Sequence, residues 1–299
     1  KKMKTKWLYL VAIIGASALI ADGVITPSLT VMASIEGLKQ IKGLELGINP
    51  ILAITTIILV VIFVIQQFGT SFIGKFFGPI MVIWFLFLGI MGIINLQYHP
   101  EILKSFNPYY AYKLIVNSPK ALWILGAVFL CTTGAEALYS DLGHCGAKNI
   151  RVSWFFVKVM LVLNYLGQGS WLLKNYEMVF TGTNPFFGML PQFLIIPAVI
   201  LATAAAIIAS QALITGSFTI FSEAMSLNFW PFQQIEYPSG LKGQMYIPRI
   251  NWGLLIMCIV VVFYFKESVH MEAAYGLSIT VTMLMTTVLV IFWLWRNRV

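Results

Sequence analysis

Two carboxylates, those of Asp22 and Glu136, fall well inside long apolar stretches of the chain, whereas the other acidic residues fall in loops or at the ends of such stretches. An acid at the centre of a membrane helix costs about 2.5–3.5 kcal/mol and commonly faces a cavity or a partner. No Lys or Arg is expected at the same depth, which disfavours a structural ion pair. Either burial keeps the acid protonated or a mobile cation neutralises it, and both alternatives predict ion handling.

Asp22 opens the sequence DGVITPSLT, in which Asp22, Thr26 and Thr30 recur every four residues and therefore share one face of a helix. Pro27 removes a main-chain hydrogen bond and would release the carbonyl of Gly23. A carboxylate, two hydroxyls and a carbonyl are hard oxygen ligands that suit an alkali cation. A kinked helix whose threonines bond to their own backbone is the competing interpretation.

Glu136 lies in TGAEALYSDLGHCG, with Thr133 three residues before it and Tyr139 three residues after it on the same helical face. Glycines at 134, 143 and 146 lower the helix propensity around the acid. Broken helices that expose backbone carbonyls to a cavity are a device of membrane transporters. Each of the two stretches thus places one acid and neighbouring hydroxyls on one helical face. This similarity favours a single ion site whose oxygen ligands come from both helices.

Other polar features are weaker. The stretch AAYGLSITVTM (273–283) carries Tyr275, Ser278, Thr280 and Thr282, which could line a site or pack against neighbours. The small residues of GQG (167–169) and ATAAAIIAS (202–210) favour close helix packing over ligand binding. The three cysteines have no metal-ligand spacing.

The composition places these residues in a membrane. Of 299 residues, 59% are hydrophobic and only 10% are charged, and the mean hydropathy is +0.86. Soluble domains carry about 25% charged residues, and long continuous apolar runs are not the alternating pattern of a membrane β-barrel. The net charge of +8 is better explained by loop lysines and arginines that orient the protein than by nucleic-acid binding. We therefore expect an all-α polytopic membrane protein.

Apolar length and the bounding Gly, Pro and charged residues predict eight membrane spans. They are 8–36, 50–68, 76–96, 121–140, 153–173, 192–222, 252–266 and 271–295. The first and sixth are long enough to be tilted or kinked. The segment 99–120 is expected to be an outside hairpin or an interfacial segment, and 231–252 an inside loop. More Lys and Arg fall on the side that holds both ends, which predicts cytoplasmic ends.

Six motifs resemble the KUP/HAK/KT family of potassium uptake permeases, and the resemblance covers essentially the whole chain. They are DGVITPSLTVMASIEGL (22–38), GTSFIGKFFGPIM (69–81), TGAEALYSDLGHCG (133–146), NYLGQGSWLL (164–173), GQMYIPRINW (243–252) and AAYGLSITVTM (273–283).

The resemblance implies a leucine-transporter-like fold of ten core helices in two inverted repeats. The eight spans would be core helices three to ten of one transmembrane domain (1–299). Residues 1–96 would be the remainder of the first repeat, and 121–296 the second repeat. The family motif GDxGTSPLY of the broken first helix is absent, as are the helices beyond the tenth and the C-terminal cytosolic region.

The resemblance also implies a potassium site. It assigns K⁺ ligands to Asp22, Thr26, Thr133 and Glu136, with Thr30 and Tyr275 near the site. Glu136, together with Asp22, would couple K⁺ to protons. The missing first helix would supply another acid and a tyrosine.

We expect potassium uptake by secondary active transport, as K⁺/H⁺ symport with alternating access. An amino-acid or polyamine transporter of the same fold is the alternative, and two mid-membrane acids favour a cation over it. An enzyme is not expected, because neither the GxGD setting of an intramembrane aspartyl protease nor an HExxH motif occurs. A TVGYG-like channel filter is also absent, although sequence leaves channel-like conduction open.

The expected location is the plasma membrane, and the expected partners are membrane lipid and K⁺, without a cofactor or nucleic acid. A homodimer through the family's C-terminal region remains open.

Overall fold

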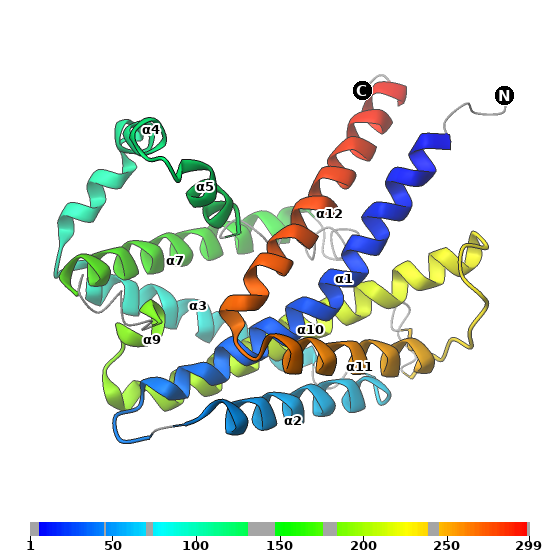
Figure 1. Ribbon diagram of the computed structural model, residues 1–299, viewed down its shortest axis with the longest axis horizontal. Helices are drawn as coiled ribbons and strands as arrows, with labels where there is room; N and C mark the ends of the chain where they lie inside the picture. Colours follow the sequence, from blue (N-terminus) through cyan, green and yellow to red (C-terminus); the bar gives the residue numbers. More distant parts are fainter. Residues whose placement is uncertain are drawn as a thin grey trace.

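The computed structural model describes residues 6–44, 46–69, 74–130, 147–175, 184–238 and 245–297. These residues form helices joined by turns, together with one isolated antiparallel bridge between Glu236 and Tyr246. Long helices lie side by side, and the start of α1 and the end of α12 project together at one end of the molecule (Figure 1). The described part of the chain is therefore all-α, as the apolar runs predict.

Seven described helices are long and apolar enough to cross a membrane. They are α1 (Lys6–Glu36), α2 (Ile48–Gln66), α3 (Gly74–Leu96), α7 (Ala147–Lys174), α10 (Gln192–Ser226), α11 (Pro248–Phe265) and α12 (Ser268–Asn297). Each corresponds to one of the predicted spans. The remaining predicted span is 121–140. The structure describes its first part as α5 (Ala121–Leu130), and the rest of this span lies outside the described residues.

The long first and sixth predicted spans are single helices that contain proline. α1 continues through Pro27 and α10 through Pro197. α10 has 35 residues, and at about 1.5 Å per residue it exceeds the roughly 30 Å hydrocarbon core. A helix of this length must tilt or extend beyond the membrane. α11 begins at Pro248, a few residues before the predicted boundary, because proline at the first helical position loses no hydrogen bond.

α1 is the central helix of the described structure, because it packs against α2, α10, α11 and α12. Small residues permit the close approach. A Cβ on Gly15 would lie 3.0 Å from Cβ of Met285 in α12, and one on Gly23 would overlap Ser217 in α10. The apolar side chains of α1, α2, α10 and α11 form one core that includes Met32, Phe63 and Phe218.

α3 and α7 form a second close pair, which meets the first group through contacts between α3 and α10. Gly167 of α7 lies against Gly92 of α3. This contact confirms the packing interpretation of the GQG sequence. A smaller apolar core includes Ile51, Trp171 and Phe187, and it joins the ends of α2, α7 and α10 with α9 (Pro185–Gly188).

Shorter elements connect the long helices: η1 (Gly37–Gln40), η2 (Pro100–Phe106) and α4 (Pro108–Asn117). Asn107 caps α4, because its side-chain oxygen accepts the N–H of Tyr109 at 3.0 Å. Every residue of α4 is exposed, and α4 stands apart from the long helices (Figure 1). This arrangement agrees with a hairpin or interfacial segment between two membrane crossings. The division into inverted repeats stays a prediction.

Candidate functional site

The carboxylate of Asp22 is buried within the membrane-spanning helix α1, where its residue is 1% exposed. The hydroxyl of Thr26, one turn later, donates to Oδ1 of Asp22 at 2.6 Å. Thr26 is also buried. The local helix explains this pair, since residues four apart lie on the same face. The predicted acid and hydroxyl stripe is therefore formed at these two positions.

Thr30 differs from Thr26, although the sequence places them at the same spacing. Its hydroxyl donates to the main-chain carbonyl of Thr26 at 2.7 Å, and its side chain is only partly buried. This is the backbone-bonded state that threonines commonly adopt in helices. The structure therefore joins Asp22 and Thr26 directly and gives Thr30 a contact with the helix backbone.

The side chains of α12 fall into buried and exposed faces. Ser278 and Thr282 are buried, and Tyr275 is half-buried against the apolar core. Thr280 is exposed, and its hydroxyl bonds the carbonyl of Gly276 at 2.7 Å. The polar patch predicted for this stretch is thus divided: three of its members face the protein, and Thr280 faces outward.

Ser278 connects α12 to the turn of α1 that carries Asp22. Its hydroxyl donates to the carbonyl of Ala18 at 2.7 Å, and in an α-helix that carbonyl is also the acceptor for the N–H of Asp22. At about 100° per residue, Gly15, Asp22 and Thr26 lie on nearly the same side of α1. Because Gly15 contacts Met285 of α12, this is the side that faces α12. Tyr275, one turn before Ser278, lies along the same interface.

Thr133 and Glu136 lie outside the described residues, so their relation to Asp22 stays a prediction. The same holds for Tyr139.

Other faces of α1 carry buried polar contacts that the sequence pattern does not reveal. Ser28 donates to the carbonyls of Val24 and Cys258, at 2.8 and 3.2 Å. The thiol of Cys258 donates in turn to the carbonyl of Val24 at 3.3 Å. Cys258 therefore forms part of a polar contact between α1 and α11. No local sequence signal links residues so far apart in the chain.

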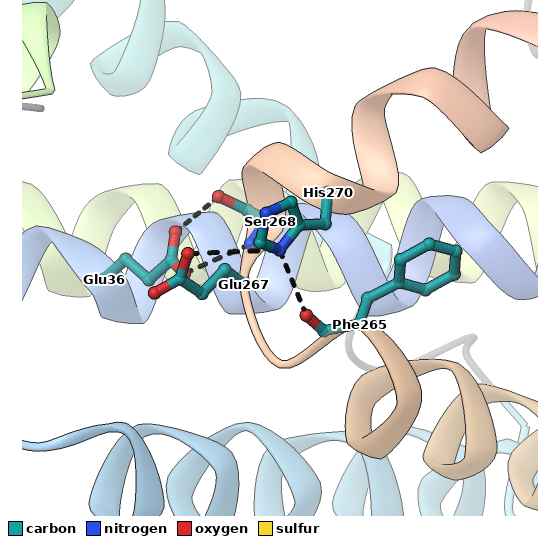
Figure 2. A network of polar contacts seen from close by, with 5 residues as sticks. All are labelled: Glu36, Phe265, Glu267, Ser268 and His270. Carbon is teal, nitrogen blue, oxygen red and sulfur yellow. Dashed lines mark hydrogen bonds and ion pairs between the residues drawn. The ribbon is translucent and has the colours of Figure 1, made fainter.

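Glu36, at the end of α1, contacts the beginning of α12 (Figure 2). Its carboxylate accepts the N–H of Ser268 at 3.1 Å and also the Ser268 hydroxyl. Nearby, Glu267 lies 4.0 Å from the exposed ring of His270. The sequence marks Glu36 only as an acid at a span end. The one sequence feature that could have suggested its partner is Ser268, a serine at the start of a later helix.

The helices and the buried pair define a class of protein: a multi-pass α-helical membrane protein with an acid and a hydroxyl inside one of its spans. Such intramembrane acids mark substrate or ion pathways in membrane proteins. The hydroxyl and carboxylate oxygens of this pair can bind a proton or a cation.

The whole stretch 1–298 matches the family described as "K+ potassium transporter integral membrane domain", and the chain belongs to that family. It is similar to the "Probable potassium transport system protein Kup" of Flavobacterium psychrophilum, with 52% identity over 100% of this chain and 46% of the relative. It is also similar to the "Probable potassium transport system protein Kup 1" of Lactobacillus acidophilus, with 53% identity over 100% of this chain and 47% of the relative. The chain thus spans about half the length of these curated relatives. No solved structure matches the chain.

Proposed function

We propose that this chain forms part of the transport domain of a potassium uptake permease of the plasma membrane. The observation that carries the proposal is Asp22, whose carboxylate is buried inside a membrane span and accepts a hydrogen bond from Thr26. Membership of a family of K⁺ transporter domains supports K⁺ as the cation that this acid would bind. The proposed activity is transport rather than catalysis, and its substrate is K⁺, without a cofactor.

In the proposed site, K⁺ exchanges its water for oxygens of Asp22 and Thr26 on α1. Tyr275 lies near the site on α12. Thr133 and Glu136 are assigned to the same site on the strength of the sequence motif alone. Thr30 is placed at its edge, since its hydroxyl is bound to the backbone carbonyl of Thr26.

The proposed mechanism is secondary active transport with alternating access, in which K⁺ moves together with a proton. An inward-negative potential contributes about 2.3 kcal/mol per charge per 100 mV. Coupling requires an acid that gains and loses a proton during the cycle, and Glu136 and Asp22 are the candidates. We also place both ends of this stretch in the cytoplasm, because more Lys and Arg fall on that side.

The test uses the full-length protein in a strain without potassium uptake, grown at limiting K⁺. The wild-type protein should restore growth and Rb⁺ uptake, whereas Asp22→Asn and Glu136→Gln should not. A panel of labelled amino acids and polyamines serves as the substrate control. Normal rescue by both variants would refute the site.

Proton coupling needs a separate measurement. In proteoliposomes, K⁺ uptake should acidify the lumen, and an imposed pH gradient should drive Rb⁺ accumulation. Uptake that moves no protons and ignores the gradient would refute symport and leave K⁺ transport standing.

A further inference from the structure

Glu36 occupies an unfavourable position in its own helix. It is the last residue of α1, where the helix dipole places roughly half a negative charge and disfavours an acid. Its carboxylate instead contacts the first residue of α12, accepting the N–H and the hydroxyl of Ser268. Negative charge is favoured at that helix N-terminus. The acid therefore stabilises the start of α12 rather than the end of α1.

The contact between Glu36 and Ser268 fixes α12 along α1. The hydrogen bond from Ser278 to the carbonyl of Ala18 joins the same two helices further along α12. Tyr275 lies between Ser268 and Ser278 in α12 (Figure 2 shows the Ser268 end). The two contacts therefore bracket the tyrosine that faces the interface carrying Asp22.

The Glu36 contact is the stronger of the two, because hydrogen bonds to a charged acceptor are roughly twice as strong as those between neutral groups. α12 needs this support, because among the described helices it packs mainly along α1 and much less along α11. The turn before it is tight: Lys266 adopts a left-handed conformation with φ 62°. Repulsion from Glu272, which feels the charge of Glu36, opposes the contact and reduces its net effect.

We propose that Glu36 is a positioning residue: through Ser268 it sets the register of α12 on α1 and holds Tyr275 at the interface with Asp22 and Thr26. The inference rests on the proposed function, since the consequence for transport requires that this interface binds K⁺. Glu36 itself does not touch the ion.

The first measurement is Rb⁺ uptake by the full-length protein. Loss of the charge-assisted contact should raise the KM of Glu36→Ala by about five- to tenfold at unchanged Vmax. Ser268→Ala retains its N–H and should raise the KM by about twofold. Glu36→Gln, which keeps an acceptor oxygen, should fall between them. Glu36→Gln also allows the proposal to be tested if Glu36→Ala does not fold.

The matched control is Glu267→Gln. Glu267 lies in the same turn as Ser268, and its carboxylate pairs with exposed His270 rather than with α1. This variant removes an equal charge without breaking the contact, so its KM should stay at the wild-type value. An equal rise in Glu267→Gln and Glu36→Ala would mean that the acids only attract cations, and would overturn the proposal.

A second measurement does not depend on transport. Deuterium uptake by the first two turns of α12 should increase in Glu36→Ala, because the Ser268 N–H loses its acceptor, and should not change in Glu267→Gln. Unchanged exchange, an unchanged KM, or a fall in Vmax alone would overturn the proposal. If exchange increases as expected but Asp22→Asn transports normally, the proposed ion site fails while the register contact stands.

Discussion

Gly92 of α3 and Gly167 of α7 meet backbone to backbone: a Cβ on Gly167 would lie 2.5 Å from the Cα of Gly92. A Cβ on Gly92 would overlap the main-chain carbonyl of Leu163. Neither obstacle is a flexible side chain that could move aside. Small residues permit this approach in membrane helices, where dispersion contacts and not the hydrophobic effect hold helices together.

Gly92→Ala should therefore destabilise the protein by about 1–3 kcal/mol, because the added methyl group forces the two helices apart. Thermal unfolding of the purified full-length protein in detergent measures the effect. Gly78→Ala is the control on the same helix: among the described residues nothing lies within 4 Å of a Cβ at Gly78. It should be neutral or stabilising, since alanine has the higher helix propensity. Equal melting temperatures for the two variants would contradict the close packing.

Thr26→Val should weaken Rb⁺ uptake strongly, whereas Thr30→Val should change it little. The first substitution removes the hydroxyl that donates to Asp22 at 2.6 Å, and a hydrogen bond to a charged group contributes about 1.5–3 kcal/mol, or about tenfold or more in KM. The second removes only a bond to the backbone. The measurement is the KM for Rb⁺ of both isosteric variants. Similar KM values for the two variants would contradict the prediction, because they would mean that the hydrogen bond to Asp22 does not distinguish Thr26 from Thr30.

Ser278→Ala should destabilise the contact between α12 and α1 by about 1 kcal/mol, the usual net value of a buried hydrogen bond. It should also raise the KM for Rb⁺, since the lost bond ends at the turn that carries Asp22. Thr280→Val, two residues away on the exposed face, is the matched control and should alter neither quantity. Unfolding temperature and uptake kinetics measured together test both expectations. A larger effect of Thr280→Val would contradict the assignment of the two faces.

Tyr246 should make the protein sensitive to alkaline pH. Burial raises the pKa of Tyr246 above its ordinary value of 10.0, and the nearby charge of Glu236 raises it further. The folded state therefore favours the neutral phenol. Its contribution to stability is complete below about pH 10 and is lost as the pH rises through the folded-state pKa.

The measurement for Tyr246 is the melting temperature between about pH 8 and 11. Tyr246→Phe should lose part of the decline seen in the wild-type protein at high pH, whereas the exposed Tyr237→Phe should retain it. Identical pH profiles for Tyr246→Phe and the wild-type protein would refute the prediction.

The amino-acid sequence alone determined the class of the protein and the limits of most of its spans. Apolar length is a local property, so a window of about 20 residues is enough to recognise a membrane helix. Seven predicted spans therefore agree with the described helices within four residues, except that α7 begins six residues before its predicted span. The helical period was also sufficient to place Asp22 and Thr26 together, because residues four apart share a face whatever the helix packs against.

Only the tertiary structure decided which equally spaced residues differ in role. Thr26 and Thr30 have the same spacing, yet packing buries Thr26 and leaves Thr30 only partly buried. Ser278 and Thr280 are close neighbours on opposite faces, and the position of α1 determines which is buried. Glu36 and Ser268 are 232 residues apart. Their pairing depends on how α1 and α12 pack over their length, which no local pattern in the sequence contains.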